Sequence, residues 1–417
     1  MGKYLRGAVP VIVAAFALTA CGFSGGSGNS GGGDGTQTIS MLVPSYSDAT
    51  KSIWEGLIND FEAQNPKIKV SLEIQSWDNI NDVVRTKVQA NKAPDILNID
   101  AYAGFAKDGL LYPADQIASP STIADFQDSF KQNASLDGTQ YGLPLIASTR
   151  ALFYNKDLFG KAGIAAPPKT WDELLADATR ISALGGGVYG YGMPLGKEEA
   201  QAETSIWTFG NGGSWTDGKK ITVNTAQNTE AVAYMKKVID AKATEPNPGA
   251  TDRTPLINVF IQGKIGMIEA LPPTIGQIEQ KNPALTYAVA PIPTKDGSPV
   301  TLGVADHLMV FKNGGDAAKR EADKKFIDFF FKVDNYLKFV DKEGFLPTTK
   351  SGAEKTTNKD TFQTFLAGLP DAKFYPSNNG AWQATQGAIQ SLIGLIAQGK
   401  SPDDVLKQIQ AKADAAG

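Results

Sequence analysis

The hydrophobic and polar positions along the chain predict alternating strands and helices. An apolar strand at 38–43 precedes a helix whose inward face is formed by residues spaced three or four apart: Ile53, Trp54, Leu57, Ile58 and Phe61. A half-buried strand at 70–74, an amphipathic helix at 80–88 and a strand at 95–99 follow. This order predicts an α/β fold with a largely parallel sheet.

Capping residues predict where several helices begin and end. Ser47 or Asp48 is expected to cap the first helix, and Asn65 with Pro66 is expected to end it. Thr170 and Glu173 have the spacing of a capping box. The same patterns predict further strands at 265–268, 287–290 and 304–311, and further helices at 226–241, 316–333, 335–342, 381–398 and 402–414.

The N-terminal segment has the pattern of an exported lipoprotein. A basic start is followed by an apolar run that ends at Cys21, and this run is too short to span a bilayer comfortably. Residues 1–20 are therefore predicted to be a signal peptide. Residues 18–21 resemble a bacterial lipobox, in which Cys21 receives the lipid, and residues 21–36 are predicted to form a flexible Gly/Ser tether.

Composition and charge exclude several classes of function. The net charge of −4 disfavours nucleic acid as a partner. One cysteine and one histidine, His307, cannot form an ordinary structural zinc site, and no nucleotide-binding glycine motif is present. We therefore expect no cofactor and no metal. The 44 acidic residues leave glycosidase chemistry by paired carboxylates open, so a lipid-anchored glycoside hydrolase is the alternative from another class to the expected protein without enzymatic activity. His307 is expected to be a buried residue with its hydrogen bonds satisfied.

Motifs along nearly the whole chain after the leader resemble the extracellular solute-binding proteins of carbohydrate ABC importers, the group that contains maltose-binding protein. The most specific block is YGLPLIASTRALFYNKDLFGKAGIAAPPKTWDEL at 141–174. The other matching segments are FEAQNPKIKV (61–70), APDILNID (93–100), WTFGNGG (207–213), FIQGKIGM (260–267), GFLPTTK (344–350) and GKSPDDVLKQIQAK (399–412).

The resemblance implies a periplasmic-binding-protein-like α/β fold with two lobes joined by a hinge and a ligand cleft between them. The N-terminal lobe is expected to contain residues 37–147 and 304–350. The C-terminal lobe is expected to contain residues 148–303 and 351–417. A ligand that contacts both lobes stabilises the closed state, which then presents a surface to the permease.

The resemblance also implies a set of ligand-binding residues at strand ends, at the hinge and on facing helices. From the N-terminal lobe and the hinge these are Ser45, Tyr46, Trp77, Asp78, Asp100, Tyr102, Ser148 and Arg150. From the second lobe and the returning strand they are Glu203, Thr204, Trp207, Asn211, Glu269, Gly303, Asp306 and Trp382. For Arg150 a salt bridge inside a lobe, and for Trp382 core packing, are the alternatives.

One departure from the family pattern bears on the ligand. Residues 269–273 stand where many members have Gly-Pro-Trp, so a stacking tryptophan is missing and a long malto-oligosaccharide is disfavoured. The acidic candidates favour a mono- or disaccharide, including an amino sugar or polyol. A non-sugar solute such as a polyamine, glycerophosphodiester or peptide is the alternative. The expected protein is a monomer outside the cytoplasm, anchored by Cys21, that delivers its carbohydrate to the transmembrane subunits of an ABC permease.

Overall fold

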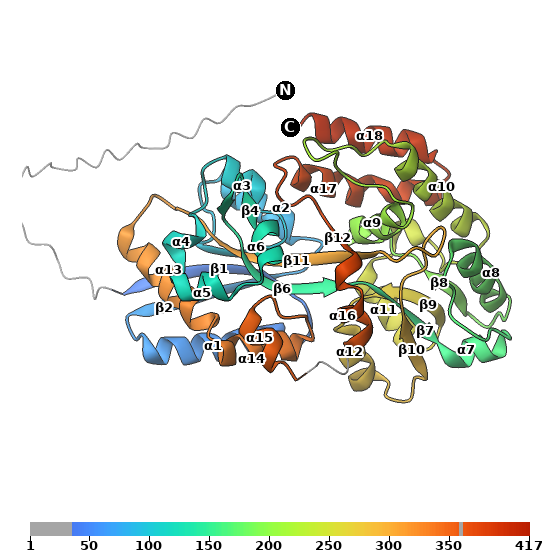
Figure 1. The fold of residues 1–417 in the computed structure, drawn as a ribbon, viewed down its shortest axis with the longest axis horizontal. Coiled ribbons are helices and arrows are strands. Elements are labelled where there is room, and N and C mark those ends of the chain that lie inside the picture. Colours follow the sequence, from blue (N-terminus) through green and yellow to red (C-terminus); the bar gives the residue numbers. More distant parts are fainter. Residues whose placement is uncertain (1–35, 358–361) are drawn as a thin grey trace, which may run out of the picture. The chain divides into compact units, whose positions relative to one another are not determined.

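Two β-sheets organise residues 36–357 and 362–417, which are the part of the chain described by the computed structural model (Figure 1). We call the part built on the larger sheet lobe 1 and the part built on the smaller sheet lobe 2. The predicted signal peptide, Cys21 and nearly all of the predicted tether fall outside the described residues, so they stay predictions. Within the described residues, no helix is long and apolar enough to cross a membrane.

The sheet of lobe 1 has the order β12-β11-β3-β1-β2, and β6 also pairs with β11. The β2-β1-β3 core is parallel, as the strand–helix alternation predicted. The sheet as a whole is mixed, because β11 runs antiparallel to β3 and β6. Its strands are β1 (Gln37–Pro44), β2 (Ile68–Gln75), β3 (Ile96–Ile99), β6 (Leu143–Thr149), β11 (Thr301–Val310) and β12 (Ala372–Phe374).

The sheet of lobe 2 has the order β10-β7-β9-β8 and is also mixed, with β8 and β9 parallel. Its strands are β7 (Ala151–Asn155), β8 (Tyr189–Gly192), β9 (Ile265–Ala270) and β10 (Tyr287–Ala290). A small hairpin adds β4 (Ser135–Leu136) and β5 (Thr139–Gln140).

Helices surround both sheets (Figure 1). The helices of lobe 1 are α1 (Thr50–Gln64), α2 (Ile80–Gln89), α3 (Ala103–Lys107), α4 (Ala114–Ile117), α5 (Pro120–Asp125), α6 (Asp128–Asn133), α13 (Ala317–Phe330), α14 (Val333–Glu343) and α15 (Lys350–Lys355). Those of lobe 2 are α7 (Lys156–Lys161), α8 (Trp171–Ser182), α9 (Ala200–Gly210), α10 (Ala226–Asp240), α11 (Arg253–Ile261), α12 (Thr274–Lys281), α17 (Trp382–Leu392) and α18 (Pro402–Asp414). Helix α16 (Gln363–Ala367) packs against β6, and three short 3₁₀ segments lie at 248–250, 369–371 and 393–398.

The local signals in the sequence set most helix ends, with two exceptions. The capping box of Thr170 and Glu173 is present at α8. The predicted cap of α1 is wrong, because the helix begins at Thr50 and its N-cap residue, Ala49, makes no side-chain cap. The Thr50 hydroxyl instead accepts the backbone N–H groups of Tyr46 and Ser47. The predicted helix at 381–398 is α-helical only to Leu392 and continues as a 3₁₀ segment.

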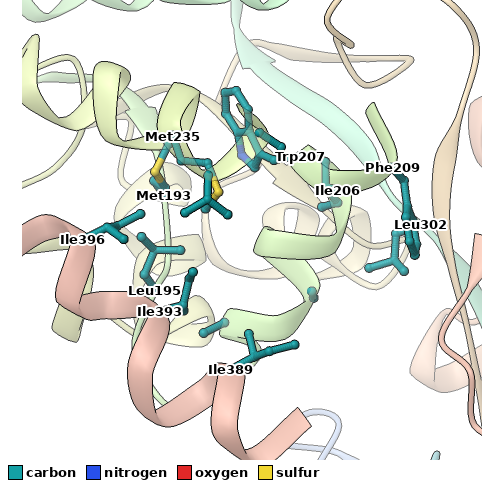
Figure 2. Packing of buried hydrophobic residues seen from close by; sticks show 14 of the residues in the cluster. Met193, Leu195, Ile206, Trp207, Phe209, Met235, Leu302, Ile389, Ile393 and Ile396 are labelled. Atoms are coloured by element: carbon teal, nitrogen blue, oxygen red, sulfur yellow. The ribbon is translucent and has the colours of Figure 1, made fainter. Parts of the chain in front are cut away.

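Each lobe has a core rich in large side chains, and a further buried cluster joins the lobes, since it contains Ala147 and Ala305 of lobe 1 with Phe153 of lobe 2. In lobe 1, Trp54 of α1 is fully buried and stacks on Phe330 of α13. In lobe 2, Trp207 of α9 packs beside Met235 in the same core as Ile389 and Ile393 of the C-terminal segment (Figure 2). Burying a large apolar side chain contributes about 1.5–3 kcal/mol, so each lobe has its own source of stability.

The chain passes between the lobes where strands of one sheet lead into the other. β6 ends at Thr149 and β7 begins at Ala151, so Arg150 joins the two sheets. The chain returns between β10 and β11, and it leaves β12 for α17. The expected lobe limits at 147 and 303 fall inside β6 and β11, which belong to the larger sheet along their whole length. These limits stay a prediction.

Candidate functional site

A cleft of about 700 Å³ is lined by residues of both lobes. Lobe 1 contributes the segment after β1, the ends of β3 and α14, and part of β11. Lobe 2 contributes the start of α9, α11, α12 and one face of α17. Side chains from distant parts of the sequence therefore meet in one cavity, lined by both apolar and polar groups, of a size that suits a small ligand.

Seven of the predicted site residues line this cleft, and the sheet topology brings them together. The parallel strands β1 and β3 end at the same edge of the sheet, and β11 and β6 continue it toward the hinge. The seven residues are Ser45, Tyr46, Trp77, Asp100, Ser148, Arg150 and Asp306. That these seven residues contact a ligand stays a prediction, and the position of that ligand would be this cleft.

Two buried carboxyl groups stand on the lobe 1 side of the cleft. Asp100 follows β3 and Asp306 lies on β11, and each is 3% exposed. Burial raises the pKa of Asp100 to about 6. Burial, together with the charge of Asp100, raises the pKa of Asp306 to about 8. Because burial and the charge of Asp100 both oppose ionisation of Asp306, the two carboxyl groups hold one proton between them near neutral pH.

Two aromatic rings lie beside these carboxyl groups. The Tyr46 hydroxyl lies 2.8 Å from Oδ2 of Asp306 and 3.0 Å from Oδ1 of Asn98. Its ring meets Trp77 edge to face, with centroids 5.6 Å apart. Both residues are half-buried and line the cleft, so they offer apolar surface next to polar groups. Such surface suits the C–H faces of a sugar.

The lobe 2 side of the cleft has ion-paired charges. Glu199 lies between two arginines, with Oε1 2.8 Å from Arg150 and Oε2 2.9 Å from Arg253. Arg253 also contacts Glu203 at 3.0 Å, and Glu203 accepts the Tyr191 hydroxyl at 2.6 Å. The alternative considered for Arg150, a salt bridge, is therefore present, although Arg150 also lines the cleft.

Nine predicted site residues do not line the cleft. Glu203, Thr204 and Trp207 are buried inside lobe 2, and Tyr102 and Trp382 are completely buried. Asn211 bonds to Gln227 and Glu230 outside the cleft. The others are Asp78, Glu269 and Gly303. Trp382 packs in the core, which was the alternative considered for it. Its ring stacks on Tyr375 with centroids 5.1 Å apart.

Two of these nine have evident structural reasons for their position. A Cβ at Gly303 would lie 2.7 Å from the Phe374 ring, so glycine lets β11 and β12 approach. Glu269 is 1% exposed, and burial together with the nearby Glu203 raises its pKa well above the usual value. Its backbone oxygen accepts a hydrogen bond from Arg253.

His307 is buried as predicted, but its hydrogen bonds are not satisfied. Its ring meets Tyr102 edge to face, and neither ring nitrogen has a hydrogen-bond partner among the described residues. Burial lowers the pKa of His307 to about 3, so it stays neutral near pH 7. It does not line the cleft.

Glu199, Tyr375 and Gln386 line the cleft and were not anticipated from the sequence. Glu199 has a left-handed backbone (φ 60°), which a sequence pattern does not reveal for glutamate. Gln386 follows the predicted Trp382 by one helical turn, so the motif identified the helix but not the residue that faces the cleft. Gln386 donates to Oδ2 of Asp100 at 3.3 Å and so joins the two lobes.

Unpartnered polar atoms mark where the cleft can accept a ligand. Oδ1 of Asp100, Oε1 of Gln386, Nε of Arg150 and the Tyr375 hydroxyl are buried and have no hydrogen-bond partner within residues 36–357 and 362–417. Buried polar atoms normally have partners, so an unpaired set at a cavity indicates a missing partner. The same residues contain no group of side chains with the composition of a metal site.

Comparison with known proteins places this architecture among binding proteins. The family model described as bacterial extracellular solute-binding protein matches residues 45–337. A putative binding protein of Brucella abortus is 37% identical over 90% of this chain and 92% of its own length. The diacetylchitobiose-binding protein DasA of Streptomyces coelicolor is 26% identical over 99% of this chain and 98% of its own length.

A solved structure has the same fold as this chain. A solute-binding protein from Thermotoga lettingae, bound to α-D-tagatose, superposes with a TM-score of 0.80 at 24% identity. The match covers 92% of this chain and all of that one. The two-lobed α/β fold expected from the motifs is confirmed.

Proposed function

We propose, from the premise that the chain belongs to the bacterial extracellular solute-binding protein family, that it captures a mono- or disaccharide for an ABC importer. The observation that supports this most is the set of unpartnered polar atoms in a cleft formed by both lobes. Two relatives with similar sequence or fold bind carbohydrates, which supports the same ligand class.

The contacts of the cleft suit capture by hinge closure. Asp100 and Trp77 belong to lobe 1, whereas Tyr375 and Gln386 precede or belong to α17, which packs in lobe 2. A saccharide that bonds to both sides binds the closed arrangement more tightly and so favours it. The rings of Trp77 and Tyr46 cover apolar faces of the sugar while the carboxyl and amide groups accept its hydroxyl hydrogens.

Isothermal titration calorimetry against mono- and disaccharides tests the ligand class, with amino acids and short peptides as the comparison set. We expect saturable sugar binding with no change in the sugar. A ligand at 100 times its Kd also stabilises the folded protein by about 2.7 kcal/mol, which a thermal shift detects. Binding only to peptides or amino acids would contradict the proposal, and release of hydrolysis products would favour a glycoside hydrolase.

Membrane anchoring through Cys21 and delivery to the permease belong to the same proposal. A receptor held near its permease by a lipid and a tether of roughly 20 Å delivers ligand locally. Cys21→Ser in the full precursor should move the protein from the membrane fraction to the soluble fraction and lower uptake. Sugar affinity should stay unchanged, because Cys21 precedes the sheets that form the cleft. Retention of the variant in the membrane would contradict the anchor.

A further inference from the structure

The two sides of the cleft differ in how their charges are balanced. On the lobe 2 side, Arg150 and Arg253 are matched by Glu199 and Glu203 in three ion pairs of 2.8–3.0 Å. On the lobe 1 side, no Lys or Arg nitrogen of the described residues forms an ion pair with Asp100 or Asp306. A buried carboxylate is unfavourable unless a cation or several donors compensate it.

The groups that face this acidic pair do not supply the missing cation. Arg150 is the nearest cationic influence, but its two terminal nitrogens already bond to Ser148 and Glu199. Glu199 adds negative charge, and this charge raises the pKa of both Asp100 and Asp306. Tyr46 and Gln386 contribute one side-chain hydrogen bond each, and the backbone N–H groups at positions 100 and 101 also stabilise the Asp100 carboxylate, but all of these donors are neutral. The pair is therefore left with excess negative charge.

The open hydrogen-bonding positions beside the pair include two acceptors. Oδ1 of Asp100 and Oε1 of Gln386 are both unpartnered, and each residue is 3% exposed and lines the cleft. They are close in space, because Nε2 of Gln386 lies 3.3 Å from the other oxygen of Asp100. The nearby Tyr375 hydroxyl is also unpartnered and can accept a third bond.

We propose that the cleft selects a carbohydrate with a free, protonated amine, and that its ammonium group lies against Asp100 and Asp306. This inference rests on the proposed function and names the ligand class for the same cleft. An ammonium group has three donors and no acceptor, which matches unpartnered carboxylate and amide oxygens. A neutral hydroxyl supplies one donor and brings no positive charge to the acidic pair.

Matched sugars test the proposal directly. Glucosamine, N-acetylglucosamine and glucose differ only at C2. The β-1,4-linked disaccharide of glucosamine, diacetylchitobiose and cellobiose differ only at C2 of each of their two residues. At about pH 6.5, below the roughly 8 of an α-amino group, the free amine is protonated. We expect the free amine to bind about tenfold or more tightly than its N-acetyl and neutral counterparts, since charge-assisted hydrogen bonds are the stronger ones.

The panel separates failure of this inference from failure of the proposed function. Tighter binding of the neutral or N-acetylated sugar would overturn the inference and leave the proposed function standing. If another saccharide binds but none of these six does, the inference falls and the proposed function stands. If no saccharide binds at all, both fall.

Two variants locate the amine. Asp100→Asn and Asp306→Asn each keep the side-chain shape and remove one carboxyl group that can ionise against the ammonium, so each should reduce the preference for the free amine to about threefold or less. Asp115→Asn removes a charge from an exposed position of α4 outside the cleft and should leave the preference unchanged. Thermal unfolding of each variant verifies that it folds. An unchanged preference in either folded Asp variant would overturn the proposal.

Proton release gives a test on the unaltered protein. The acidic pair holds a proton near neutral pH, and an ammonium group that pairs with it displaces that proton. Calorimetry at pH 7 in two buffers with different ionisation enthalpies measures the protons released. We expect release with the amino sugar and less with its neutral counterpart. Equal release with both sugars would contradict the placement of the ammonium group.

Discussion

Acidic side chains stand on both sides of the cleft: Glu199 and Glu203 of lobe 2 are ion-paired, whereas Asp100 and Asp306 of lobe 1 form no ion pair within the described residues. Glu203 is completely buried, and its carboxylate accepts hydrogen bonds from Arg253, Tyr191 and Trp207. Asp100 and Asp306 are nearly as buried, and neither contacts a cationic side chain among the described residues. The first arrangement stabilises the lobe without ligand, whereas the second leaves groups that a ligand can satisfy.

This difference indicates which acids are structural and which are available. A buried charge with all its partners already present gains nothing from a ligand, and removal of one partner is costly. A buried acid without a cation destabilises the free protein when it ionises. We therefore expect loss of a partner of Glu203 to destabilise the protein, and removal of the charge of Asp100 or Asp306 to stabilise the ligand-free protein.

The largest expected effect comes from breaking the paired side. Arg253→Met should lower the free energy of unfolding by about 3–5 kcal/mol, because it leaves Glu203 buried and unpaired. Urea unfolding measures the change. The double variant Arg253→Met/Glu203→Gln removes the orphaned charge and should recover part of the loss. A single variant as stable as the parent protein would contradict the structural role of the ion pairs.

Substitution of two tryptophans should affect stability in one case and ligand affinity in the other. Trp382→Ala should destabilise by about 3–5 kcal/mol, because the side chain is completely buried against Tyr375. Trp77→Ala should cost far less stability, since the ring is half-buried, and should weaken sugar binding about tenfold through lost stacking. Thermal unfolding and calorimetry give the two quantities. If Trp77→Ala leaves affinity unchanged, the sugar does not lie against this ring.

The pH dependence of stability tests whether Asp306, which has no ion pair, has a raised pKa in the folded protein. The folded-state pKa of Asp306, about 8, exceeds the usual 3.8, so between these values the folded protein holds a proton that the unfolded chain releases. Stability is therefore lost as pH rises through this range. Asp306→Asn does not titrate, and its stability relative to the parent should increase by about 1–3 kcal/mol between about pH 5 and 8.

The control for that titration is Glu203→Gln, which should not gain stability at higher pH, because Glu203 is compensated by Arg253. Unfolding at several pH values, without ligand, provides the measurement. A relative stability of Asp306→Asn that is independent of pH would mean that Asp306 ionises normally in the fold.

The smallest expected effect concerns an exposed contact between the two sides. Lys197 of lobe 2 lies 3.0 Å from Asp82 of α2 in lobe 1, and both side chains are about half exposed. Lys197→Met should lower ligand affinity by no more than about fivefold, with the difference shrinking at high salt. Lys407→Met breaks a pair within α18 and should have no effect on affinity. A loss larger than tenfold would show that the contact governs closure.

The sequence predicted where helices and strands lie better than it predicted which of their residues line the cleft. Helix α18 and strand β10 have the predicted limits, and the apolar spacing of α1 identified all five of its buried large residues. These features depend on neighbours three or four positions away. The cleft was only partly anticipated: the motif around Trp382 indicated α17, but its cleft-facing residue is Gln386. Which side of a helix faces a cavity depends on its packing partners, which are distant in the sequence.

By itself, the sequence determined the strand–helix order and the parallel β2-β1-β3 core, because periodicity and capping are local properties, and its motifs carried the resemblance to the family. Only the tertiary structure decided which acids are compensated. Glu199 and Glu203 lie one helical turn apart at the start of α9, yet one lines the cleft between two arginines and the other is buried beneath it. The partners that distinguish them from Asp100 and Asp306 come from remote segments, and Coulomb interactions depend on distance in space rather than along the chain.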